Sequence, residues 1–260
     1  MTNVRATVAY TGGGFHGFAA NEGVRTVAGD IEAALAKIIG EHITITCAGR
    51  TDKGVHGRGQ VISFEIPGSG DGHDQINDLD RIQHSLNRMC GPTIAISGMQ
   101  RVPEAFNARF SATWRQYRYH VWNSATPDPF RVGNSWHVQP PLDVDRMNAA
   151  AAQLVGTHDF SSFCRRPTPA EGEPEKSLVR DVLSAEWFCG AGPEAELLTF
   201  WVRATSFCHQ MVRSFVGTTV DVGLGRINPD DIPFILAKQD RQAAGRVAPP
   251  EGLTLWEVGY

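Results

Sequence analysis

Cysteine and long hydrophobic runs are scarce in this sequence. Its 260 residues include five cysteines, which are widely spaced and form no CxxC pair. This pattern argues against a disulfide framework or a structural zinc site, so we expect reduced thiols. No apolar run approaches the ~20 residues that span a membrane, and residues 1–5 lack the apolar core of a secretory signal. These absences predict a cytoplasmic protein that contains no metal and no membrane span.

An excess of positive charge is also missing. The formal net charge is -4, whereas nucleic-acid-binding proteins usually carry a basic footprint. The cations are nevertheless unevenly distributed, and six of them gather in two stretches of the chain: Arg50, Lys53, Arg58, Arg109, Arg115 and Arg118. Because local charge matters more for binding than the sum, the pattern is compatible with a basic cleft on an acidic body.

Hydrophobic periodicity predicts a βαββαβ order in the first half. Alternating apolar residues indicate strands at 4–10, 43–47, 61–66 and 93–97. Helical spacing predicts one helix from Val27, with Thr26 as its cap and Gly40 at its end, and a second helix over 76–89. This order is typical of a ferredoxin-like or RNA-recognition-like unit.

The second half has a similar pattern. Strands are predicted at 115–122, 135–138, 179–188, 197–204 and 253–258, helices at 144–154, 207–222 and 231–237, and a mobile loop at 167–174. We therefore predict an α+β protein with two ferredoxin-like halves, mainly antiparallel sheets and a cleft between the halves. The predicted domains are residues 1–106 and 107–260.

Residues 12–17 literally match GxGxxG after a predicted strand, and Arg50 follows the next strand. A dinucleotide site requires a helix that opens within the glycine loop, so that its N-terminus meets the pyrophosphate. Here the predicted helix begins ten residues after Gly17. The strands around Cys47 and Val61 also have no helix between them, which makes parallel pairing improbable. An NADP-dependent oxidoreductase is thus disfavoured, and we predict a simple loop.

The segment 48–60 carries four glycines, three cations, one histidine and Asp52 between two predicted strands. Small residues allow a ligand to approach the backbone, and cations bind phosphate or stack on bases. Nearby cations favour an ionised Asp52, which suits a nucleophile. The alternative is a solvated turn in which Asp52 bonds its own backbone, and composition alone leaves both interpretations open.

Two further segments attract attention. Arginines alternate with aromatic residues over 106–110 and 114–120, a combination that binds unpaired bases and phosphates. The alternative is an amphipathic strand with Tyr117 and Tyr119 inward and Arg118 outward. In 206–217 the apolar spacing predicts a core helix, in which Arg213 requires a carboxylate or a ligand if it is buried.

Together these segments resemble the tRNA pseudouridine synthase A family. The resemblance is carried, in family order, by residues 48–56, 106–112, 117–119, 159–163, 179–181, 211–213, 216–217 and 248–253. It implies isomerisation of uridine to pseudouridine at positions 38 to 40 of the tRNA anticodon stem-loop. It also implies a homodimer that needs no cofactor, in which each tRNA contacts both subunits. The chain departs from the family pattern at Thr11, Phe18 and Ala19.

The resemblance also implies residue roles. Asp52 matches the catalytic aspartate, Tyr117 the tyrosine that stacks on the target uracil, Arg213 the basic partner of the aspartate, and Arg50 the arginine that fills the space of the extruded base. The remaining predicted substrate-binding residues are Lys53, His56, Arg58, Phe106, Asn107, Ala108, Arg109, Phe110 and Arg115. We expect Arg213 to contact Asp52, or else to pair with a local acid such as Asp221. A non-catalytic RNA-binding module is the alternative function.

Overall fold

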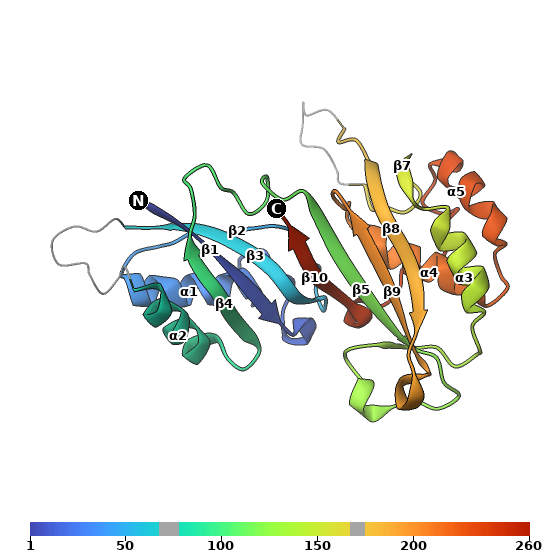
Figure 1. The fold of residues 1–260 in the computed structure, drawn as a ribbon, viewed down its shortest axis with the longest axis horizontal. Coiled ribbons are helices and arrows are strands. Elements are labelled where there is room, and N and C mark those ends of the chain that lie inside the picture. The colour runs from blue at the N-terminus through green and yellow to red at the C-terminus, as the bar shows by residue number, and fades with distance from the viewer. Residues whose placement is uncertain (68–77, 167–174) are drawn as a thin grey trace. The chain divides into compact units, whose positions relative to one another are not determined.

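The computed structural model describes residues 1–67, 78–166 and 175–260 (Figure 1). The chain forms two compact units, Met1–Thr113 with Thr254–Tyr260, and Trp114–Leu253. The predicted division into domains 1–106 and 107–260 concerns independent folding, which these compact units do not test, so it stays a prediction. The loop predicted at 167–174 lies outside the described residues, as do the first two residues of the helix predicted over 76–89.

The first unit has the predicted βαββαβ order. Its elements are β1 (Thr2–Tyr10), α1 (Val27–Ile39), β2 (Thr46–Cys47), β3 (His56–Ile66), α2 (Leu79–Cys90), β4 (Ile94–Arg101) and the last strand β10 (Leu253–Gly259). β1 lies between β3 and β4 and is antiparallel to both, and β2 is antiparallel to β3. β10 adds a short parallel pair with β3. The α+β class with mainly antiparallel strands is therefore confirmed.

Local sequence signals set the ends of α1. The Thr26 side chain accepts a hydrogen bond from the Gly29 amide (3.2 Å), which satisfies one of the free donors of the first turn. Gly40 ends the helix with φ of 90°, a left-handed conformation that glycine adopts without a steric penalty. The boundaries predicted from Thr26 and Gly40 are confirmed.

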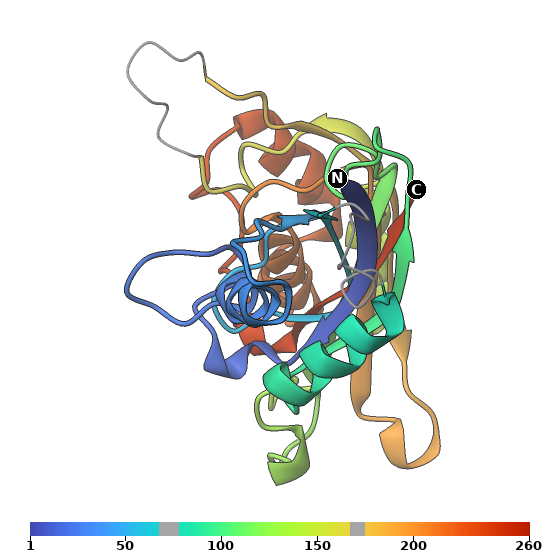
Figure 2. The ribbon, with the colours of Figure 1, turned by 90° about the vertical axis from the view of Figure 1, so that its left-hand side faces the viewer.

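Both helices of the first unit pack on one face of its sheet (Figure 2). The alternating residues Val4, Ala6, Val8 and Tyr10 of β1 all point into this core, as the period of two in a strand requires. The opposite face carries a smaller cluster around Ala48, Val61 and Ala108.

The second unit departs from the predicted order. Its elements are β5 (Trp114–Trp122), β6 (Trp136–His137), α3 (Val144–Ala152), β7 (Gly156–Asp159), β8 (Val179–Cys189), β9 (Leu197–Ala204), α4 (Met211–Gly223) and α5 (Ile232–Lys238). The strands β5, β9, β8 and β7 lie side by side in this order and are antiparallel, while β6 runs parallel to β5. β7 was not predicted because Gly-Thr-His-Asp has no apolar alternation, and β10 groups with the first unit.

Helix α4 is buried along its length except at Arg213. The segment 245–248 lies against it: the Gly245 amide donates to Thr218 Oγ1 (3.0 Å), and the Ala248 amide donates to the Arg213 carbonyl (3.0 Å). At Gly217 a Cβ would lie 1.7 Å from the Arg246 carbonyl oxygen. The helix can therefore approach this segment only because residue 217 has no side chain.

A disulfide joins Cys164 to Cys208, with 5.8 Å between their Cα atoms. The expectation of five reduced thiols is therefore wrong for this pair. The two residues are 44 positions apart, and neither lies in a motif that signals pairing, so their proximity follows from the fold alone. Cys47, Cys90 and Cys189 are free thiols.

We expect Gly217→Ala to lower the free energy of unfolding by about 1–3 kcal/mol, the usual cost of overpacking a core. Alanine favours a helix by about 1 kcal/mol over glycine, but the contact with the Arg246 carbonyl outweighs this gain. Denaturant unfolding checks the prediction. Gly13→Ala is the control, because a Cβ at Gly13 meets nothing within 4 Å. Unchanged stability of Gly217→Ala would show that the segment 245–248 yields easily.

Candidate active site

The loop that carries Asp52 connects β2 to β3 and is fixed at several points. The Tyr10 hydroxyl lies 2.7 Å from Thr51 Oγ1, and both residues are buried. The fully buried Gln60 side chain donates to the Gly49 carbonyl (2.6 Å) and accepts from the Gly49 amide (3.3 Å). A turn closes the loop where the Val55 amide donates to the Asp52 carbonyl (3.1 Å). Asp52 itself stays partly exposed on this constrained backbone.

The glycine-rich segment 12–17 packs against the Asp52 loop. A Cβ at Gly12 would lie 2.2 Å from the Val55 carbonyl oxygen, and one at Gly17 would lie 2.8 Å from that of Thr51. The Gly12 amide also donates to His56 Nδ1 (3.1 Å). The first α-helix of the chain begins at Val27, so these glycines serve close backbone packing, and the loop interpretation is favoured over a dinucleotide site.

Phe18, one of the departures from the family pattern, is a core residue. Its side chain is 1 % exposed, and its ring centroid lies 5.7 Å from that of Tyr10. Its amide donates to the Thr51 carbonyl (3.1 Å). The backbone of Phe18 therefore supports the same loop as the Tyr10 hydroxyl.

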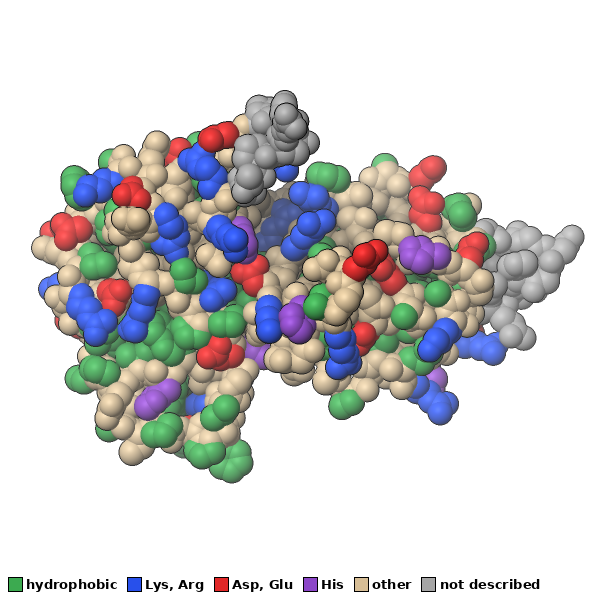
Figure 3. Space-filling model, turned by 180° about the vertical axis from the view of Figure 1, so that it is seen from behind, with side chains coloured by type: hydrophobic (Ala, Val, Ile, Leu, Met, Phe, Trp, Pro, Cys, Tyr) green, Lys and Arg blue, Asp and Glu red, His purple; other side chains and the backbone are tan. Residues whose placement is uncertain are grey.

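Three exposed cations, Arg50, Lys53 and Arg58, belong to the Asp52 loop and the start of β3. Arg58 lies over the Trp256 ring at 4.2 Å. Burial raises the pKa of the Cys47 thiol, while the charges of Arg50 and Arg109 oppose this shift. Arg50 and Arg109 therefore both lie close enough to Cys47, in the strand that precedes the Asp52 loop, for their charges to act on its thiol. Figure 3 shows that cations and carboxylates are otherwise interspersed on the displayed face.

The segment 106–110 combines anchoring residues with exposed ones. Asn107 Oδ1 accepts from the amides of Arg109 (3.0 Å) and Phe110 (3.1 Å). Ala108 is fully buried, and its backbone bonds Ser63 Oγ and the Tyr260 hydroxyl. The Arg109 side chain is exposed, as is Phe110 at 78 %.

Phe106 extends the same anchor, with its ring 5.0 Å from that of Tyr260. Of the predicted substrate-binding residues in this segment, Arg109 and Phe110 are therefore the ones whose side chains solvent reaches most freely. Phe106, Asn107 and Ala108 hold the segment in shape.

The second unit contributes Tyr117, on β5. Its ring is 8 % exposed and meets the Phe207 ring edge to face at 5.1 Å. Its neighbour Arg115 is buried and donates to the Thr205 carbonyl (2.9 Å). β9 and the segment before α4 thus fix the orientation of both side chains.

Arg213 is held by the segment that follows α5. Its Nε donates to the Ala248 carbonyl (2.7 Å), and it is the one residue of α4 that is not buried. The local acid Asp221 receives Arg226 at 2.9 Å instead. The structure therefore gives no support to a pairing of Arg213 with Asp221.

Sequence reasoning missed the supporting role of Tyr119, which it placed in the core. The hydroxyl of this fully buried residue donates to the Pro249 carbonyl (2.8 Å), next to the acceptor of Arg213. Burial, reinforced by the Glu251 charge, raises the pKa of Tyr119, so the phenol remains a neutral donor at physiological pH. Nothing in the sequence signals this contact, because Tyr119 and Pro249 are 130 residues apart and lie in no common motif.

Two features are absent from the described residues. No helix among them is long and apolar enough to cross a membrane. In the same part of the chain, no group of three or more His, Cys, Asp or Glu side chains is placed to hold a metal ion.

Comparisons with known proteins agree with the resemblance. Residues 150–260 match the model of a family described as tRNA pseudouridine synthase. A tRNA pseudouridine synthase A from Brevibacillus brevis is 42 % identical and is covered over 100 % of both chains. That of Bacillus subtilis is 36 % identical over 99 % of this chain and 98 % of the relative. A chain from a solved Cbf5-Nop10-Gar1 complex aligns with 84 % of this chain and over 53 % of its own length, at 11 % identity and a TM-score of 0.32. By its full-length relatives, the chain belongs to the tRNA pseudouridine synthase A family.

Proposed function

We propose that this protein isomerises uridine to pseudouridine in tRNA, at positions 38 to 40 of the anticodon stem-loop. The observation that carries the proposal is a partly exposed Asp52 on a loop fixed by Tyr10 and Gln60. Flanking exposed cations complete the proposed site. A reaction on a base within a folded RNA requires both a placed carboxylate and cations that hold the backbone.

The proposed reaction begins with extrusion of the target uridine from its stack. The Asp52 carboxylate then either attacks C1′ of the sugar or removes the C2′ proton, and in both cases the N1–C1′ bond breaks. The uracil turns and reattaches through C5, which displaces Asp52 from C1′ in the first route and is accompanied by return of the C2′ proton in the second. A base then removes the C5 proton, and N1 gains a proton. Substrate and product have the same atoms, so the reaction requires no redox step and no cofactor.

Other side chains have proposed roles in this reaction. Tyr117 stacks on the uracil, and Arg50 fills the space that the extruded base leaves. Exposed cations such as Lys53, Arg58 and Arg109 hold phosphates, and His56, whose ring already accepts the Gly12 amide, lines the site. An RNA-binding module without catalysis shares these cations but has no role for Asp52.

Incubation with uridine-labelled tRNA, without any added cofactor, tests the function. We expect pseudouridine in the nucleoside digest of the wild-type reaction. Asp52→Asn keeps the shape of the side chain and removes its charge, so kcat should fall at least about a thousandfold while tRNA binding persists. Glu65→Gln, an exposed change on β3, is the matched control. Substantial turnover by purified Asp52→Asn would exclude the assigned role, and absence of product with wild type would favour the binding module.

We also propose that Arg213 serves as the basic partner of the Asp52 carboxylate in this reaction. A guanidinium stays charged at any working pH and binds a carboxylate with two parallel hydrogen bonds. Arg213→Lys keeps the positive charge but cannot form the two parallel hydrogen bonds, so kcat should fall about a hundredfold while the protein still folds. Arg226→Lys, just beyond α4, is the control. Wild-type kcat for Arg213→Lys would leave Arg213 with a purely structural role toward Ala248.

We further propose a homodimer in which each tRNA contacts both subunits, as the family resemblance implies. Sedimentation equilibrium should give twice the 28.4 kDa chain mass. The functional test mixes Asp52→Asn chains with an excess of chains that are defective in RNA binding. If each tRNA contacts both subunits, a heterodimer has one intact Asp52 and one intact RNA-binding surface. The measured activity should then change in proportion to the fraction of heterodimer. A monomer at working concentrations would contradict this proposal.

The proposed location is the cytoplasm, where the substrate of such an enzyme would be found. The Cys164–Cys208 disulfide is unusual for that compartment, because cytosolic thiols are generally kept reduced.

A further inference from the structure

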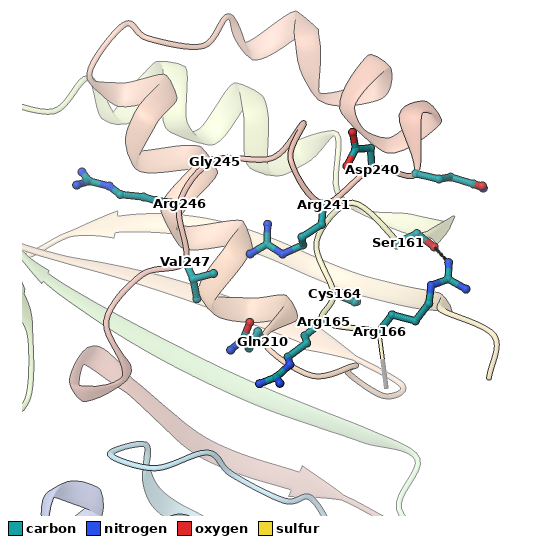
Figure 4. A pocket seen from close by; sticks show the side chains of 11 residues that line it. Ser161, Cys164, Arg165, Arg166, Gln210, Asp240, Arg241, Gly245, Arg246 and Val247 are labelled. Carbon is teal, nitrogen blue, oxygen red and sulfur yellow. Dashed lines mark hydrogen bonds between the residues drawn. The ribbon is translucent and has the colours of Figure 1, made fainter. Parts of the chain in front are cut away.

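The second unit contains an arginine-lined cavity that has no part in the proposed chemistry. Its volume is about 700 Å³, and its described lining residues include four arginines and one carboxylate, that of Asp240. Figure 4 shows that these arginines come from two segments, Arg165 and Arg166 after β7, and Arg241 and Arg246 after α5. Asp240 is engaged in a local turn, where it accepts the Gln242 amide (2.9 Å). Among the described lining residues, positive charge therefore exceeds negative charge.

Arg241 is the innermost of the four. It points into the space beside Val247 (Figure 4), and its Nη2 donates to the buried Ser214 Oγ of α4 (2.9 Å). Burial lowers the pKa of Arg241, which means that its charge is incompletely solvated. A bound anion would offset this loss of solvation.

The start of α4 adds to the positive potential. Gln210, which precedes the helix, lines the cavity and gives it no side-chain cap. Free amides at a helix N-terminus carry a partial positive charge and favour anions. The Cys164–Cys208 disulfide and a bond from the Arg165 amide to the His209 carbonyl (2.9 Å) hold Arg165 beside this end.

The other two arginines already have partners. Arg166 bonds Glu175 and Ser161. Arg246 lies 3.9 Å from Asp221 and over the Trp136 ring. Within the described residues, no ion pair engages the exposed Arg165. Arg165 and Arg241 are therefore the two cations best placed for a ligand.

We propose that this cavity binds a backbone phosphate of the RNA substrate. The inference rests on the proposed function for the identity of the RNA and adds a contact in the second unit, on residues distinct from Asp52, Tyr117 and Arg213. Arginine side chains match phosphate oxygens with paired hydrogen bonds. No aromatic ring is among the described residues that line the cavity, so a nucleobase would have only guanidinium planes to stack on. A phosphodiester therefore fits better than a free nucleotide.

Binding of tRNA to the Asp52→Asn protein, measured by fluorescence anisotropy over a range of salt concentrations, tests the proposal. Arg165→Ala should weaken binding several-fold and flatten the slope of log K against log salt by about one. Arg165→Lys should restore most of that slope, because it returns the charge. Arg226→Ala, an exposed arginine of the same unit outside the cavity, should leave the slope unchanged.

Two outcomes would overturn the proposal. One is an unchanged slope with Arg165→Ala, provided that its unfolding curve matches that of the parent. The other is calorimetric binding of inorganic phosphate that depends on Arg165 while the tRNA slope does not, which would identify a site for a free anion. Failure of the function is distinguishable, because a wild-type protein that makes no pseudouridine can still show the Arg165-dependent slope.

Discussion

Close backbone packing between the glycine segment 12–17 and the Asp52 loop is the constraint on which the proposed site depends. Gly12 and Gly17 approach the Val55 and Thr51 carbonyls more closely than any side chain would allow. The buried contact between Tyr10 and Thr51 holds the same loop from the strand side. A carboxylate that must meet one sugar carbon benefits from such a backbone, because small displacements of a reacting group reduce rates sharply.

Helix α4 plays a comparable part in the second unit. Its burial on all sides except at Arg213 fixes the direction of that side chain, and the segment 245–248 supplies the carbonyl that receives it. The same helix directs its N-terminus toward the arginine-lined cavity through Gln210. One rigid element thus positions both a proposed partner of the reaction and a proposed phosphate contact. The arginine-lined cavity also shows how a chain with a net charge of -4 can present local positive potential to RNA.

Much of the first unit could be predicted from local patterns. The cap at Thr26, the end at Gly40 and the inward alternation of β1 all follow from residues within a few positions of one another. The amphipathic strand that was the alternative for this segment places Tyr117 and Tyr119 inward, and both are buried on β5, since strand periodicity needs only near neighbours. The ordered motifs around Asp52 and Arg213 also sufficed to recognise the family.

By itself, then, the sequence determined most element types, the two ends of α1 and the family, because these depend on neighbouring residues. Tertiary structure decided what depends on segments far apart in the chain. In the folded chain the glycine motif that resembles a nucleotide-binding fingerprint supports the Asp52 loop, and Cys164 pairs with Cys208. β7 also joins the strands of the second unit, next to β8. Tertiary structure also brought Arg165 and Arg241 to one cavity across more than seventy residues. Periodicity carries no information on such contacts, since they arise only when whole elements pack.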